Sequence, residues 1–300
     1  TVPFISRYRK EVTGSLDEVQ VAAIRDRITQ LRELDKRREA ILKSISEQGK
    51  LTDELKDKIE KAQTMSELED LYLPYKPKRR TRATIAKEKG LEPLALAIFE
   101  QGKFDVLTEA EKYLSEEKEV KSIEEALAGA RDIIAELVNE NQEARTKIRK
   151  LFLDTAIITS RVITGKENEG IKYKDYFDWK EPIKNIPSHR MLAMRRGEKE
   201  GFLMLDILPE EEVAVDILTR QFVLNNSEAA KQVKLATEDA YKRLMQPSIE
   251  TDVRMSTKQH SDEDAIKVFA ENLKQLLMAA PLGQKNVLAI DPGFRTGCKV

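Results

Sequence analysis

Hydrophobic residues recur every three or four positions along most of this chain, which is the spacing of amphipathic helices. The first long run begins at a capping box of Ser15 and Glu18 and extends to about Gln48. Two shorter helices follow, the second beginning at Thr64. We therefore expect residues 1–73 to form an N-terminal helical array.

Three short helical segments separated by glycines come next, at 81–89, 93–101 and 108–114. With the connector before them they form a small insert, residues 74–120, whose order of elements is helix-turn-helix-like. A further helical region, residues 121–283, is expected to continue the array.

Within this last region, a capped helix is predicted from Ser122 to about Ile163, with a break near residues 139–141. Several Gly, Pro and aromatic residues predict an irregular segment at 164–190. The run FLMLDIL at 202–208 is the one strand candidate before the C-terminal end. The other helices are predicted from a cap at Ser188 to 201, from Pro209 onwards, and at 227–245 and 261–280.

The composition favours a mainly α-helical fold. Of the 300 residues, 35% are charged and only 6% are aromatic. This profile is typical of helices with wide solvated faces rather than of a β-sandwich. The net charge of −1 argues against a globally basic nucleic-acid binder, so any nucleic-acid site has to be local.

One stretch of the chain concentrates positive charge. Between residues 76 and 90, seven Lys and Arg residues accompany a single Glu. Pro74 and Pro77 forbid a continuous helix and favour extended backbone in the residues before them, so the first cations lie on a stiff, exposed connector. The candidate contact residues on this connector are Tyr75, Lys76, Lys78, Arg79, Arg80 and Arg82.

Basic residues interleaved with aromatic residues suit phosphate neutralisation and base stacking. We therefore predict that the five cations contact the phosphates of RNA or DNA and that Tyr75 stacks on a base. One alternative is a solvated loop whose arginines pair with acidic neighbours and whose tyrosines anchor it to the core. A second alternative is a helical interaction module, in which the connector and Arg190, Arg195 and Arg196 dock another domain or a polymerase subunit.

The C-terminal residues 286–300 depart from the helical pattern. Four apolar residues predict a buried strand, Asp291 stands at its end, and Pro292 and Gly293 predict a turn into a second strand. Such a start is typical of an RNase H-like fold, in which the first strand's Asp bridges two metal ions around a phosphodiester. The remaining carboxylates of such a site come from later strands. Asp291 is therefore expected to be an incomplete ligand or a turn cap, and a metal-dependent nuclease is a third hypothesis.

Other chemical motifs are missing from the sequence. His189 and His260 do not stand at zinc-like spacing from Cys298, and the sequence has no glycine-rich phosphate loop. We therefore expect no metal, no cofactor and no catalytic activity in this chain. The single cysteine and the lack of a long apolar run or signal segment predict a cytoplasmic protein without membrane contact. A first residue other than Met and a strand pattern that stops midway predict a fragment of a longer protein.

Several long motifs, in order along essentially the whole chain, resemble the bacterial Tex family of transcription accessory proteins. They are TVPFISRYRKEVTGSLDEVQ (1–20), ELEDLYLPYKPKRRTRATIAKEKGLEPLA (67–95), EEALAGARDIIAE (124–136), PSHRMLAMRRGEKEG (187–201) and VLAIDPGFRTGCKV (287–300).

This resemblance implies an N-terminal helical region, a helix-turn-helix-like insert and, in residues 286–300, the truncated start of a YqgF-type RNase H-like domain. It also implies that helix-hairpin-helix elements and a C-terminal OB-fold RNA-binding domain lie outside this chain. The role it implies is nucleic-acid binding in transcription, with nucleic acid and the transcription machinery, such as RNA polymerase, as partners.

Overall fold

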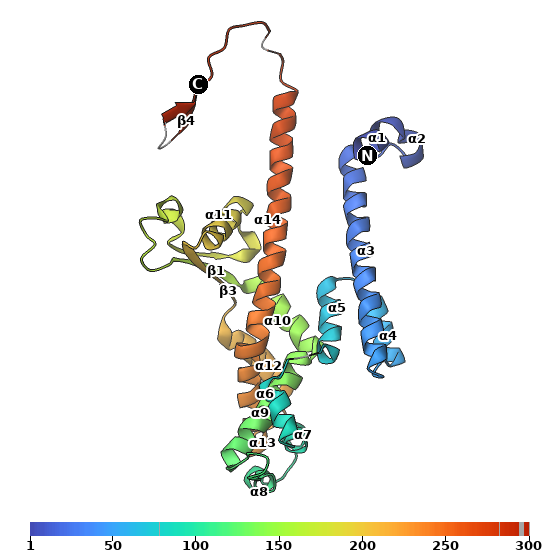
Figure 1. Cartoon of the computed structure of the whole chain (residues 1–300), viewed down its shortest axis with the longest axis vertical. Coiled ribbons are helices and arrows are strands. Elements are labelled where there is room, and N and C mark those ends of the chain that lie inside the picture. Colours follow the sequence, from blue (N-terminus) through green and yellow to red (C-terminus); the bar gives the residue numbers. More distant parts are fainter. Residues whose placement is uncertain (78, 282, 294–296, 300) are drawn as a thin grey trace.

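Two long helices, α3 (Glu18–Glu47) and α14 (Gln246–Leu277), run along the length of the molecule (Figure 1). The computed structural model describes residues 1–77, 79–281, 283–293 and 297–299. Most of these residues are helical, which confirms the predicted mainly α fold with a few strands. The short helices α1 (Val2–Tyr8) and α2 (Lys10–Thr13) lie at the N-terminal end of α3.

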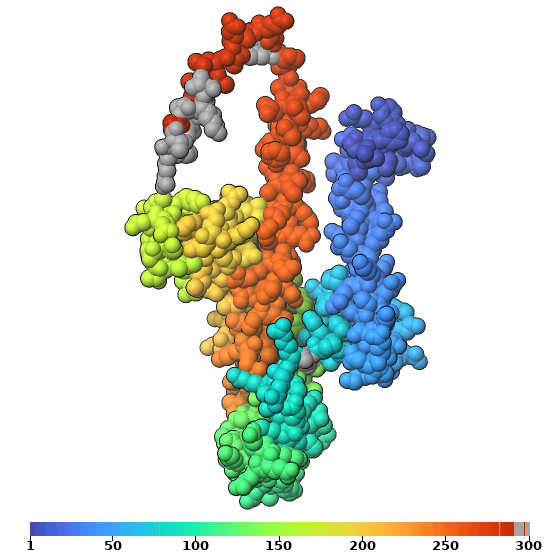
Figure 2. All heavy atoms as spheres, in the orientation of Figure 1, coloured from blue at the N-terminus to red at the C-terminus, as the bar shows by residue number. Residues whose placement is uncertain are grey.

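The N-terminal part of the chain has a hydrophobic core of its own. The end of α3 packs with α4 (Asp53–Lys61) and α5 (Met65–Tyr72), and a short turn η1 (Leu73–Tyr75) follows. The fully buried side chains of this core include Ile41, Ile45, Ile59 and Leu68. We call α3, α4, α5 and η1 the N-terminal unit. Figure 2 shows this unit as a separate lobe that meets the rest of the molecule around α5.

The caps of these helices explain where they begin. At Thr64 the predicted capping box is present: Thr64 Oγ1 accepts from the Glu67 amide at 3.2 Å, and the Glu67 carboxylate accepts from the Thr64 amide. The capping box predicted at Ser15 and Glu18 is wrong. Asp17 caps α3 instead, because its carboxylate accepts from the Gln20 amide at 2.8 Å and the Gln20 side chain accepts from the Asp17 amide.

A second and larger core holds the remaining helices and the sheet together, and we call this part of the molecule the body. The three predicted short helices are present within it, at α6 (Arg82–Glu88), α7 (Glu92–Glu100) and α8 (Val106–Glu111), and they pack on α9 (Ile123–Glu140). Gly90 allows the tight turn between α6 and α7, because its φ of +81° is unfavourable for other residues. Asn141 interrupts the helical conformation between α9 and α10 (Gln142–Thr155), as predicted.

The helix predicted to reach Ile163 is wrong beyond Thr155. Residues of that run form the strand β1 (Ile157–Val162), which pairs antiparallel with β2 (Asp178–Pro182) and with β3 (Leu203–Leu208). The sequence prediction recognised β3 alone. The order β2-β1-β3 makes β1 central, and its β-branched residues alternate between a buried and an open face. Residues 121–283 are thus not helical throughout.

Four further helices complete the described part of the body, and two of them, α11 and α14, pack on the sheet. α11 (Ser188–Lys199) packs on α14 and β3, and its N-cap is Pro187 rather than the predicted Ser188. α12 (Glu211–Phe222) starts two residues later than predicted from Pro209. α13 (Glu228–Asp239) continues through a π-helical turn η4 (Ala240–Met245) into α14. Pro247 has no amide to donate into this turn, which accounts for the local change of winding.

The C-terminal segment contains a short antiparallel pair, β4 (Asp291–Gly293) and β5 (Gly297–Lys299). The buried strand predicted immediately before Asp291 is wrong. Val287, Leu288 and Ile290 are all more than half exposed and lie outside any strand, because no described element buries them. An isolated segment of this kind has no partner with which to satisfy its backbone or bury its side chains.

Candidate nucleic-acid interface

The basic connector runs from the N-terminal unit to the body. It leaves the turn η1 at Tyr75 and reaches the first turn of α6 at Thr81. Lys76 has the extended conformation that its position before Pro77 predicts, with ψ of 127°. The same prediction is wrong for Leu73 before Pro74, which has helical backbone with ψ of −42° and enters the turn η1. Lys78 lies outside the described residues, so its predicted phosphate contact stays a prediction.

The N-terminal end of the connector is anchored by aromatic side chains. Tyr72 is buried, its hydroxyl lies 3.0 Å from Ser44 Oγ, and the Arg37 guanidinium lies 5.4 Å from its ring centroid. Tyr75 is half-buried against the same core, and its carbonyl accepts from Gln48 Nε2 at 2.9 Å. Tyr75 therefore has a packing role here, and its stacking on a base stays a prediction.

The C-terminal end of the connector is fixed by the Thr81 hydroxyl. Thr81 Oγ1 accepts from the Thr84 amide at 3.0 Å, which caps α6. The same hydroxyl donates to Glu136 Oε1 on α9 at 2.8 Å. Anchors at both ends limit the conformations open to Lys76, Arg79 and Arg80, which lie between them.

The predicted contact cations differ in their partners. Lys76, Arg79 and Arg82 are exposed and form no ion pair within the part of the chain that the structure describes. Arg80 pairs with Glu88 at 2.9 Å, but both side chains are more than half exposed. A surface pair of this kind contributes little to stability, so Arg80 can exchange its partner for a phosphate at small cost.

One acidic group lies close enough to affect Arg82. Asp132 on α9 is partly buried, and this burial raises the pKa of its carboxyl, while the nearby positive charges of Arg243 and Arg82 oppose that rise. Arg82 and Asp132 also line a shallow hollow between α6 and α9. The interface is therefore strongly basic along the connector and mixed at its α9 side.

The alternative docking helix, α11, has less free charge than the sequence predicted. Arg190 pairs with Glu181 at 2.8 Å and lies over the Trp179 ring, and Arg195 pairs with Glu198. Arg196 alone among the three is exposed. Arg190 thus joins α11 to β2, whereas the Arg195 pair lies within α11 itself.

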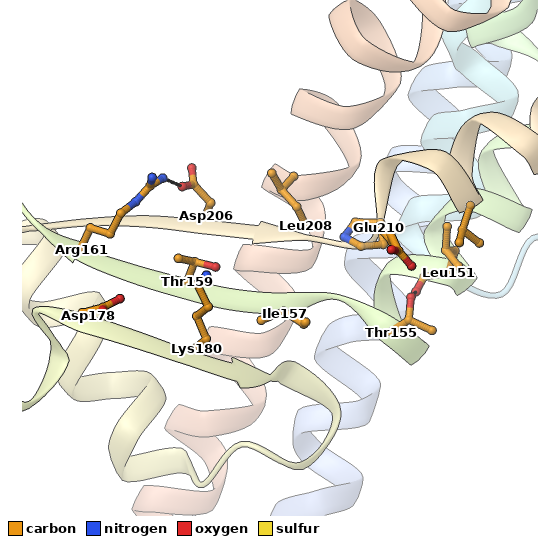
Figure 3. A pocket seen from close by; sticks show the side chains of 12 residues that line it. Leu151, Thr155, Ile157, Thr159, Arg161, Asp178, Lys180, Asp206, Leu208 and Glu210 are labelled. Carbon is orange, nitrogen blue, oxygen red and sulfur yellow. Dashed lines mark hydrogen bonds and ion pairs between the residues drawn. The ribbon is translucent and has the colours of Figure 1, made fainter.

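The open face of the sheet forms a groove of about 770 Å³. Figure 3 shows Arg161, Lys180, Asp178 and Asp206 on this face around Thr159, and Arg161 pairs with Asp206 at 2.5 Å. Positive and negative side chains alternate across the strands, so this surface has no single sign of charge. It suits a polyanion less well than the connector does.

The other predicted features give no further site. Asp291 lies in β4, paired in register with Lys299. Among the described residues, no group of three or more His, Cys, Asp or Glu is placed to hold a metal ion. Within the same ranges, no helix has both the length and the apolar character needed to cross a membrane.

A family model described as "Tex central region-like" matches residues 102–269, which is more than half of the chain. A second, "Tex-like protein N-terminal domain", matches residues 1–46. The chain therefore belongs to the Tex family. The resemblance seen in the sequence motifs is confirmed.

Individual relatives of this Tex-family chain match it over its full length. It is 46% identical to "Uncharacterized protein YdcI" of Bacillus subtilis and 43% identical to "Transcriptional accessory protein Tex" of Neisseria gonorrhoeae, covering 42% and 40% of those proteins. It is 26% identical to human "S1 RNA-binding domain-containing protein 1" and covers 31% of it. The chain thus spans about two fifths, or less, of the length of the curated relatives that it matches.

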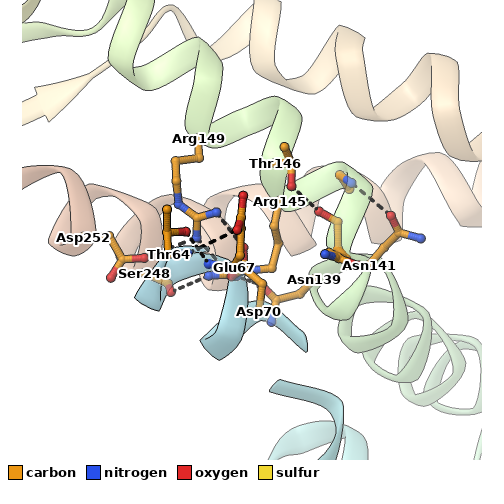
Figure 4. Close-up of polar contacts among 12 residues, drawn as sticks. Thr64, Glu67, Asp70, Asn139, Asn141, Arg145, Thr146, Arg149, Ser248 and Asp252 are labelled. Carbon is orange, nitrogen blue, oxygen red and sulfur yellow. Dashed lines mark hydrogen bonds and ion pairs between the residues drawn. The ribbon is translucent and has the colours of Figure 1, made fainter. Parts of the chain in front are cut away.

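Sequence reasoning missed one polar cluster of this Tex-family chain that lies close to the connector. Asp70 on α5 is buried and pairs with Arg145 and Arg149 on α10 (Figure 4). The signal available in the sequence was a single Asp on an otherwise apolar helical face. Its partners stand more than seventy positions away in the sequence, and no local pattern joins them.

Proposed function

We propose that this chain is the helical, non-catalytic part of a nucleic-acid-binding transcription accessory protein, and that its basic connector contacts phosphates. The observation that carries the proposal is a set of exposed cations that have no ion-pair partner among the described residues: Lys76 and Arg79 on a connector anchored at both ends, and Arg82 at the start of α6. Membership of the Tex family and the names of its relatives support the same role.

The physical argument concerns preorganisation. A flexible basic loop loses conformational entropy when it binds a polyanion, whereas a connector held by Tyr75 and Thr81 has lost much of it already. Each phosphate that a cation neutralises releases condensed counterions, so binding through the connector has to weaken steeply with added salt.

A salt titration tests the proposal. The 300-residue chain and a variant with Lys76, Arg79, Arg80 and Arg82 replaced by Gln are titrated with fluorescent single-stranded RNA and with duplex DNA. Loss of four phosphate contacts should flatten the slope of log K against log salt by about 3.6 for the duplex and about 2.8 for the single strand.

A matched variant controls for net charge. Lys43, Lys56, Lys58 and Lys61 are exposed cations on α3 and α4, and replacing them by Gln removes the same charge away from the connector. This control should keep the wild-type slope. Equal slopes for the wild type and the connector variant would refute the proposed site, and absence of binding by the wild type would refute nucleic-acid binding by this chain.

A second candidate function, a helical interaction module, is favoured by the last four turns of α14. Ile266, Phe269, Leu276 and Leu277 lie on one side of this helix and are each about two thirds exposed or more. RNA polymerase is the partner that we propose for this face. Leu276→Asp with Leu277→Asp should abolish co-sedimentation with purified polymerase while leaving nucleic-acid affinity unchanged, and polymerase binding that survives both substitutions refutes this candidate.

A further inference from the structure

The N-terminal unit and the body have separate hydrophobic cores. Among the described residues, no buried apolar side chain belongs to both cores, and the unit packs on the body through α5 and α10. At this contact the buried groups are charged: Asp70 is 3% exposed and Arg145 is 4% exposed. The relative position of the two parts therefore depends on polar geometry rather than on a shared apolar core.

One carboxylate organises this contact (Figure 4). Asp70 Oδ1 accepts from Arg145 Nε at 2.7 Å and from Arg149 Nη2 at 3.0 Å, while Asp70 Oδ2 accepts from Arg149 Nη1 at 2.5 Å. Other contacts of both guanidinium groups reach residues of the body. Arg145 donates to Asn139 and to Ser248, and Arg149 lies 3.4 Å from an Asp252 oxygen.

The chemistry of this cluster is better suited to fixing the orientation of α5 on α10 than to increasing the free energy of unfolding. A planar guanidinium binds a carboxylate in a fixed geometry, and here two guanidinium groups fix one carboxylate from different turns of α10. Burying such charges costs desolvation energy, so an ionic contact of this kind is weak evidence for stability. Sliding or rotating α5 on α10 would leave at least one buried guanidinium without its carboxylate, and this penalty selects a single arrangement.

The same arrangement determines the path of the connector. The connector begins three residues after α5 ends and finishes at Thr81, which is bonded to α9 of the body. We propose that the Asp70–Arg145–Arg149 cluster is a positioning latch, which holds the N-terminal unit at one place on the body and so sets the positions of Lys76 and Arg79 relative to Arg82 of α6. Only the consequence for binding rests on the proposed function.

The latch is tested by a distance measurement on the full 300-residue chain. Spin labels at Lys58→Cys on α4 and Lys234→Cys on α13, in a Cys298→Ser background, report the separation of the unit from the body. Asp70→Asn should broaden the distance distribution at least about twofold, because Arg145 is left buried without a counter-charge and Arg149 keeps only the longer contact with Asp252. Asp57→Asn is the matched control, since it removes an exposed carboxylate of α4 that pairs with Lys61, and it should leave the distribution unchanged.

Two further variants keep the test decisive. Arg149→Gln retains the Asp70–Arg145 pair and should broaden the distribution less, and Asp70→Glu should restore part of the narrow distribution. A narrow distribution in both Asp70→Asn and Arg149→Gln overturns the latch. Loss of helical circular dichroism in both variants also overturns it, because the cluster would then maintain the fold of the two cores rather than their relative position.

Binding separates the latch from the proposed function. If the wild type binds RNA or DNA, Asp70→Asn should weaken affinity about fivefold, the low end of usual coupling between linked sites, with an unchanged salt slope because every connector cation remains. A broadened distribution with unchanged affinity overturns the positioning role. If the wild type binds neither, the proposed function fails, and the distance measurement alone decides on the latch.

Discussion

Gln101 provides a test of how the ends of two distant helices are joined. It ends α7 with a φ of +54°, and its side chain is almost fully buried. Its Nε2 donates to the Phe222 carbonyl at 2.8 Å, and its Oε1 accepts from the Leu224 amide at 2.8 Å. One amide side chain thus satisfies two backbone groups at the C-terminal end of α12, more than a hundred residues away.

Gln101→Met keeps the approximate volume of the side chain and removes both bonds, together with a longer one from Nε2 to the Phe99 carbonyl at 3.3 Å. The Phe222 carbonyl is left buried without a donor, which costs about 1–3 kcal/mol. The Leu224 amide lies nearer to solvent, and recovery of a water partner limits its cost to about 1 kcal/mol. The free energy of unfolding of the body should therefore fall by about 2–4 kcal/mol.

Urea unfolding followed by circular dichroism measures this loss. The midpoint should fall while the slope with denaturant stays the same, because the folded and unfolded surfaces hardly change. Gln259→Met on the exposed side of α14 is the control and should change the stability by less than about 0.5 kcal/mol. An equally small change for Gln101→Met would refute the reasoning, because it would mean that water satisfies both backbone groups.

Two further predictions concern packing and pH. At Gly197 on α11, an added Cβ would lie 2.5 Å from Leu203 Cδ1 and 3.2 Å from Tyr173 Cγ. Gly197→Ala should therefore overpack this contact and lower the free energy of unfolding by about 1–3 kcal/mol. The better helix propensity of Ala offsets about 1 kcal/mol of this loss. Urea unfolding should show that Leu203→Ala relieves this penalty in the double variant, and strict additivity of the two changes would contradict the packing argument. Burial, aided by the charges of Glu211 and Glu250, raises the pKa of the Tyr241 hydroxyl to about 12. An unfolded tyrosine loses its proton at about pH 10. The contribution of Tyr241 to the free energy of unfolding should therefore be complete below about pH 10 and fall as the pH rises towards about 12. Tyr241→Phe should remove this decline and reduce the late phase of the absorbance titration, to which Tyr173 also contributes because burial raises its pKa. An absorbance titration that Tyr241→Phe leaves with the same late phase would contradict the assignment.

Local sequence determined most of the helices. Thr64 with Glu67, the Asn141 break and the Gly90 turn act within a few residues of themselves, so their effects are present in the sequence pattern. The wrong prediction of Ser15 as the cap of α3 also has a local cause. Asp17, two residues away, offers a charged acceptor for the same unpaired amides at the start of the helix.

The strands could not be recognised in the same way. Ile157–Val162 continues an apolar helical run, and a short run of this kind fits either state. Pairing with β2 and β3 decides between them, and the partners stand about twenty and fifty residues later. The outer edge of β3 depends on an element still further away, since the Ile207 amide donates to Glu250 of α14 at 2.9 Å.

The same distinction between local and distant contacts applies to the candidate site. The sequence alone determined that positive charge concentrates on a proline-stiffened connector, because charge and proline geometry are properties of neighbouring residues. Only the tertiary structure decided which cations stay unpaired, that Tyr75 packs on a core, and that Asp70 meets Arg145 and Arg149 across two separate cores. These contacts join residues far apart in the chain, and they form only when the helices have packed.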